Sequence, residues 1–104
     1  KQRSWYVSQL LYLLEELRSR PEGEGSMLDS SIVVVISEVS DGMAHSLDNM
    51  PFLLIGGGCQ LEGGRLLSYD RLPHGRLWLS LAQAMGAGIE SFGDHGNKPL
   101  EGLF

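Results

Sequence analysis

The chain has 104 residues, of which 42% are hydrophobic and 20% are charged, a composition typical of one globular unit and not of a disordered or fibrous segment. Its 13 acidic and 8 basic residues give a net charge of −5 without a basic cluster, so nucleic acid is not expected as a partner. No apolar run approaches the roughly 20 residues of a membrane helix, so no membrane span is predicted.

The first predicted element is a helix over about residues 4–20. Its apolar residues recur at helical spacing, namely Val7, Leu10, Leu11, Leu14 and Leu17. Trp5 and Tyr6 widen this stripe, so we expect an amphipathic helix that packs against more than one neighbour and places both rings in the core. Pro21 and the stretch "PEGEGS" predict that the helix ends there in a flexible loop.

Two strands are predicted next, over about residues 32–37 and 52–55. Residues 32–36 form a continuous β-branched run without alternation, which is typical of a central strand covered on both faces. The second run follows Pro51 and ends at "GGGC", because glycines accept backbone angles that other residues resist. A weak edge strand in "QLEGGRLL", a helix over about 75–85 and an irregular tail over 89–104 complete the prediction.

These elements predict a partial α/β domain over residues 1–104, with a mostly parallel sheet flanked by helices. Two fully buried strands need neighbours on both edges and helices on both faces, which this chain does not supply in full. The chain begins at Lys1 without a start methionine or a leader, so we expect further sequence upstream. The expected partners are therefore the remainder of a larger chain, of which this is the carboxyl-terminal portion, or other copies of itself.

Four polar side chains follow the first strand, at the edge where open α/β sheets place their sites: Ser37, Glu38, Asp41 and His45. Carboxylate oxygen and imidazole nitrogen are suitable ligands for zinc, manganese or a similar divalent ion. Glu38 and His45 are the predicted metal ligands. The alternative is that Glu38 caps backbone amides in the loop while His45 lies at the surface.

Other motifs are better explained by structure than by chemistry. The stretch "IGGGCQLEGG" lacks the Lys-Ser/Thr ending of a phosphate-binding loop, and Cys59, the only cysteine, is interpreted as a small packed residue. His74 follows Pro73 and is expected to help start the second helix, and the alternative is a role near the carboxyl edge of the sheet. In "FGDHGNKP" the polar residues are typical of a solvated turn.

The order of these features resembles the carboxyl-terminal region of alkaline phosphatase and sulfatase-like proteins. The stretches that carry the resemblance are "MLDSSIVVVISE", "AHSLDNMPFLLIGGG" and the helix ending in "AMG". Uncharacterised families of this group, one of them named for an HxxSHH motif, are the most similar, because their strand ends in "SE" and a later histidine precedes a glycine-rich strand. The HxxSHH motif itself is absent from this chain.

The resemblance implies that Glu38 and His45 are metal ligands and that the chemistry is metal-assisted hydrolysis of a phosphate or sulfate ester. It also implies an exported protein. Val39 stands where the superfamily has a histidine ligand, and no stretch of this chain matches the superfamily's nucleophile, so the catalytic residues remain unassigned. The alternative is a non-catalytic surface or assembly module that keeps the fold and has lost the metal centre, and Val39 favours it.

Overall fold

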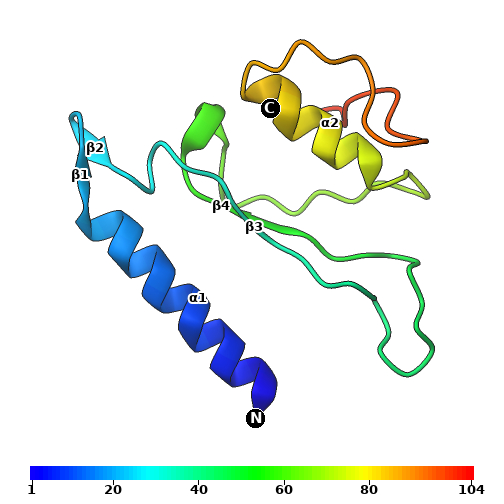
Figure 1. The fold of residues 1–104 in the computed structure, drawn as a ribbon, viewed down its shortest axis with the longest axis horizontal. Helices are drawn as coiled ribbons and strands as arrows, with labels where there is room; N and C mark the ends of the chain where they lie inside the picture. Colours follow the sequence, from blue (N-terminus) through cyan, green and yellow to red (C-terminus); the bar gives the residue numbers. More distant parts are fainter.

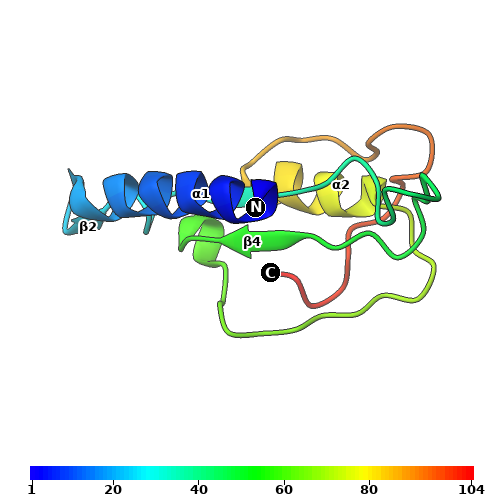
Figure 2. The ribbon, with the colours of Figure 1, turned by 90° about the horizontal axis from the view of Figure 1, so that it is seen from below.

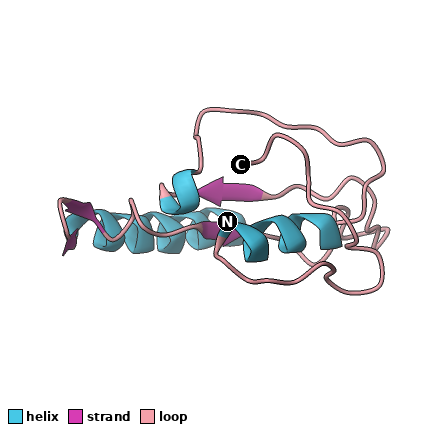
Figure 3. Ribbon diagram, turned by 90° about the horizontal axis from the view of Figure 1, so that it is seen from above, coloured by secondary structure: helices cyan, strands magenta, loops and turns pink.

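The computed structural model of the protein covers residues 1–104. In chain order the elements are the helix α1 (Gln2–Ser19), the strands β1 (Pro21–Glu22), β2 (Gly25–Ser26), β3 (Val33–Val35) and β4 (Leu53–Ile55), the 3-10 turn η1 (Gly58–Gln60) and the helix α2 (Gly75–Ala84). Long loops join them, above all around β4 and α2 (Figure 3). The weak edge strand predicted after the glycines does not form, and residues 21–26 form a short hairpin in place of a flexible loop.

The prediction of a mostly parallel sheet flanked by helices is wrong. β3 pairs with β4 and β1 with β2, and both pairs are antiparallel and two-stranded. Parallel neighbours need a crossover connection, which is usually a helix. The segment between β3 and β4 contains no helix and returns the chain beside the strand that it left (Figure 1).

The β3–β4 hairpin is covered by the core on one face and more open on the other, where Val33, Val35 and Ile55 are half-buried. Its register pairs Val34 with Leu54, so even-numbered residues of both strands point to one face and odd-numbered residues to the other. Ile32, Val34, Phe52 and Leu54 pack against the core, whereas Leu53 on the opposite face is exposed. An unbroken apolar run predicts burial on both faces; here it accompanies burial on one.

The core is a small apolar cluster between the even-numbered face of this hairpin and α2. Leu77 and Leu81 of α2 and Leu103 of the tail are buried at its centre. Further apolar side chains pack around them, namely Ile32, Val34, Phe52, Leu54, Leu61, Trp78 and Leu100. The cluster joins three segments that are distant in the sequence, so it determines the position of the hairpin relative to α2.

The glycines after β4 are required by close packing as well as by backbone angle. Gly56 has φ +121°, and a Cβ atom there would lie 2.1 Å from the carbonyl oxygen of Ser31. The amide of Gly57 donates to the Leu28 carbonyl at 3.1 Å, and that of Gly58 donates to the Ser31 carbonyl at 3.0 Å. The glycine run therefore packs its backbone directly on residues 28–31, where any side chain would intrude.

Side chains of α2 hold the irregular tail in place by hydrogen bonds to its backbone. Arg76 donates from Nε to the Lys98 carbonyl and from Nη2 to the Pro99 carbonyl, both at 3.0 Å. The buried Ser80 accepts a bond of 2.7 Å from the Leu100 amide and donates one of 2.8 Å to the Arg76 carbonyl. These bonds satisfy tail backbone groups that form no strand or helix, and they fix Leu103 near the core.

The helix α1 lies apart from the core, in contrast to the prediction that it packs on several neighbours. None of its residues is buried; Trp5 is 59% exposed and Tyr6 67% exposed. In Figure 1 it extends away from the hairpin and α2, and its links to the rest of the chain are at its carboxyl end. There the Leu28 amide donates to the Leu17 carbonyl at 3.2 Å. The apolar side chains of α1 are spread around the helix, and most of them are not covered within this chain.

The molecule is flat and less compact than a self-contained domain of its length. It measures 41 × 39 × 22 Å, and in Figure 2 α1 and α2 occupy different parts of the same thin layer. Its radius of gyration is 15.2 Å, against about 13 Å for a compact domain of about 100 residues. Neither helix combines the length and hydrophobicity that a bilayer crossing requires.

The one-sided packing of β3 predicts that charges on its two faces differ in cost. Val34→Asp places a carboxylate against the core and should remove several kcal/mol, on the order of the whole stability of a small domain. Val35→Asp, one residue along on the open face, should cost only about 1 kcal/mol. Thermal and urea unfolding of both variants measures the difference, and equal losses would contradict one-sided burial of β3.

Candidate functional site

A cavity of about 290 Å³ lies where β3 ends, β4 begins and α2 starts. Eight residues line it: Ile36, Ser37, Glu38, Leu47, Met50, Phe52, His74 and Trp78. Glu38 is the only acidic residue among them, and no lysine or arginine is present. The cavity thus combines apolar walls with one carboxylate and one imidazole.

The loop that delivers Glu38 is closed by the side chain of Asp41. Its Oδ1 accepts hydrogen bonds from the amides of Met43, at 2.9 Å, and Ala44, at 3.2 Å. Ser40 closes the same turn, because its amide and hydroxyl both donate to the Ser46 carbonyl, at 2.8 and 2.9 Å. Asp and Ser side chains typically make such hydrogen bonds to the backbone in turns. The role of Asp41 here is therefore to stabilise the loop backbone.

His45 lies inside this turn, exposed, with φ +50°. Glu38 lines the cavity and His45 does not, so the structure places with Glu38 a different histidine, His74. The chain contains no group of three or more His, Cys, Asp or Glu side chains arranged to hold a metal ion. A catalytic zinc takes three protein ligands; Glu38 and His45 would supply two, so the donor set within this chain is incomplete for such a centre.

His74 is held in the cavity wall by its aromatic neighbours. Trp78, one helical turn along α2, donates from Nε1 to His74 Nδ1 at 3.1 Å. Phe52 stacks on the imidazole with ring centroids 6.2 Å apart and meets Trp78 edge-on at 6.1 Å. The Nδ1 atom of His74 thus serves as a hydrogen-bond acceptor for Trp78.

The sequence prediction for His74 favours helix initiation over a role near the carboxyl edge of the sheet. Its carbonyl does accept the first helical bond, from the Leu77 amide at 2.9 Å, but its side chain makes no capping bond. His74 and Trp78 are four residues apart, so the sequence already indicated that they lie on one helix face and could line the same cavity wall. Their proximity to Glu38 follows from packing and has no signal in the sequence.

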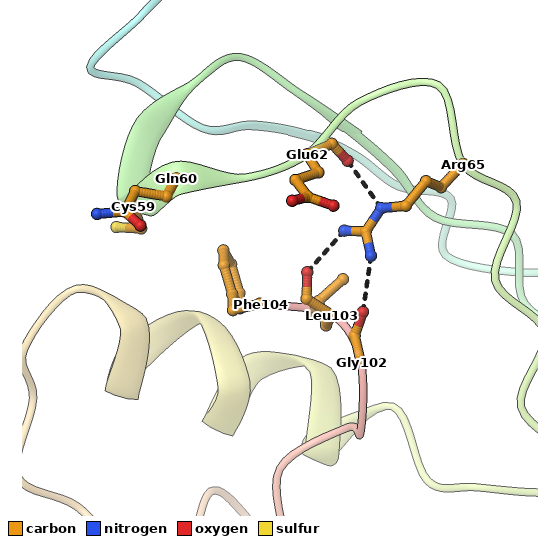
Figure 4. Close-up of a pocket in the computed structure, with 7 residues that line it drawn as sticks. All are labelled: Cys59, Gln60, Glu62, Arg65, Gly102, Leu103 and Phe104. Atoms are coloured by element: carbon orange, nitrogen blue, oxygen red, sulfur yellow. Dashed lines mark hydrogen bonds between the residues drawn. The ribbon is translucent and has the colours of Figure 1, made fainter.

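A second cavity, of about 460 Å³, lies between η1 and the tail (Figure 4). Arg65 crosses it and donates three hydrogen bonds to backbone carbonyls: Nε to Glu62 at 3.0 Å, Nη1 to Gly102 at 2.8 Å and Nη2 to Leu103 at 2.8 Å. Cys59, which also lines this cavity, is exposed, in contrast to its interpretation as a packed residue. Arg65 joins a loop to the tail, which gives it a structural role.

A scan against protein-family models found no match, and searches of curated proteins and of solved structures found none either. The resemblance to alkaline phosphatase and sulfatase-like proteins therefore stays a prediction that depends on the sequence stretches alone.

Removal of the Arg65 guanidinium should release the tail. In Arg65→Met the apolar stem is kept and three hydrogen bonds are lost, for which we expect a loss of about 1–3 kcal/mol in the free energy of unfolding. Hydrogen exchange of the Leu100 amide, which donates to Ser80, should accelerate at least about tenfold if the tail opens locally. Arg71→Met, at a side chain that is 95% exposed, is the matched control; the same acceleration in both variants would contradict a clamp at Arg65.

Proposed function

We propose that this chain is a protein-association module whose exposed apolar surface is covered by another protein subunit. The observation that supports it is the helix α1, where apolar side chains lie exposed over residues 5–13: Trp5, Tyr6, Val7, Leu11, Tyr12 and Leu13. Surfaces of this kind are characteristic of interaction sites, and aromatic residues dominate the energetics of interfaces.

The weakness of the core supports the same proposal. Only 7 of the 104 residues are buried, and 4 of these are core leucines, at positions 77, 79, 81 and 103. A two-stranded hairpin is at best marginally stable in water, and both outer edges of the β3–β4 pair are free to accept another strand. Association would cover the odd-numbered face of the hairpin and α1 at once, and so supply the burial that the single chain lacks.

Association predicts that the chain does not behave as a compact monomer. At micromolar concentration, sedimentation should detect oligomers, because the exposed apolar side chains remain available to a second copy. The double variant Trp5→Ser/Tyr12→Ser removes two rings separated by two helical turns and should weaken association at least about tenfold.

The matched control changes polar residues of the same helix, in the double variant Gln2→Ser/Gln9→Ser, and should leave the oligomeric state unchanged. A compact wild-type monomer with cooperative unfolding at this concentration would contradict the proposal. So would equal association of the aromatic and the control variants.

The second candidate is the metal-dependent hydrolase of phosphate or sulfate esters that the sequence resemblance implies. The observation in its favour is Glu38, a carboxylate three residues beyond the end of β3 in a cavity that also holds an oriented imidazole. Further ligands and a nucleophile would come from residues outside the stretches that carry the resemblance. A divalent ion in such a centre would neutralise charge on the ester oxygens.

Elemental analysis and ester assays test this second candidate. Protein purified without chelators should contain about one zinc or manganese per chain, and Glu38→Gln and His45→Asn should each lower that content about tenfold or more. His95→Asn, at another exposed turn, is the control. The absence of bound metal, together with no turnover of aryl phosphate or aryl sulfate, would contradict the hydrolase proposal. It would not affect the association proposal.

A further inference from the structure

The cavity at the end of β3 has one carboxylate beside several apolar side chains. Glu38 is exposed, and its carboxylate accepts no hydrogen bond and forms no ion pair within the chain. No lysine or arginine lines the cavity, and the Nδ1 atom of His74 accepts a hydrogen bond from Trp78. The lining therefore holds one carboxylate and no lysine or arginine to oppose it.

The walls beside this charge are aromatic and fixed. Phe52 and Trp78 meet edge-on, and Phe52 stacks on His74, so the three rings form one connected wall. Aromatic faces attract cations through the ring quadrupole, most strongly in tryptophan. They also offer apolar area that a hydrocarbon group covers favourably. The chemistry of the wall complements that of Glu38, because both favour a cation with an apolar body.

The size of the cavity limits the ligand. Its volume of about 290 Å³ is at the lower limit of small-molecule sites, which span about 300–1,000 Å³. A fully hydrated metal ion would leave the aromatic wall without apolar contact, whereas an amine with one ring would cover it. Leu47 and Met50 of the preceding loop complete the apolar lining, and methionine adapts readily to a ligand's shape.

We propose that this cavity binds a small organic ammonium ion with an aromatic or aliphatic group. The ammonium lies against the carboxylate of Glu38, and the apolar group lies against Phe52 and Trp78. This site is independent of the association surface, because neither α1 nor the odd-numbered face of the hairpin lines the cavity.

Titration of the isotope-labelled chain with 2-phenylethylammonium, followed by NMR, tests the proposal. The expected result is a saturable shift of the Trp78 indole N–H signal and of the amides of Ser37 and Glu38. A Trp5→Ser variant identifies the Trp78 signal, since these are the two tryptophans. Glu38→Gln should weaken binding about fivefold, the upper end of the range measured for exposed ion pairs.

Two controls distinguish recognition of the ammonium charge from nonspecific binding. Asp48→Asn removes the same charge from the same loop at a residue that does not line the cavity, and should leave the affinity unchanged. The neutral analogue 2-phenylethanol should bind the wild-type chain about fivefold more weakly than the amine. Equal affinity of wild type and Glu38→Gln, equal affinity for amine and alcohol, or shifts confined to the cavity at Arg65 would each overturn the proposal.

Discussion

The structure depends on the apolar contact between one face of the β3–β4 hairpin and the helix α2. Val34 and Leu54 on the hairpin meet Leu77 and Leu81 on the helix, and Leu103 completes the contact from the tail. Without it the hairpin would be two short strands in water, which are marginal alone. The candidate site depends on the same contact, because Phe52 comes from the hairpin side and Trp78 from the helix side.

Hydrogen bonds between side chains and the backbone stabilise the segments that form no helix or strand. Arg65, Arg76 and Ser80 donate to or accept from tail backbone groups, so a segment without strand or helix is still held against the core. At the first hairpin, the amide and hydroxyl of Ser26 donate to Asp29 and hold the pKa of that exposed carboxyl below its usual value. The fold is maintained by such local bonds around a small apolar centre.

The proposed association surface and the proposed ligand site lie on different parts of the molecule. The apolar side chains of α1 lie away from the core, whereas the cavity with Glu38 lies beside α2. A partner on α1 would supply burial that the single chain lacks, and it would leave the aromatic wall of the cavity accessible. Stability and ligand binding would then depend on separate surfaces, which can be altered independently by substitution.

The sequence by itself determined the local elements: a helix where leucines recur at helical spacing, extended segments at the β-branched runs, and glycines where the backbone of residues 28–31 is approached. It placed Glu38 just beyond a strand, as the structure does. Only the tertiary structure decided strand direction, the exposure of Trp5 and the pairing of Glu38 with His74 in one cavity. The reason is physical: periodicity records which side chains avoid water, whereas direction and partner depend on how the long loop between β3 and β4 returns, and no local pattern encodes that path.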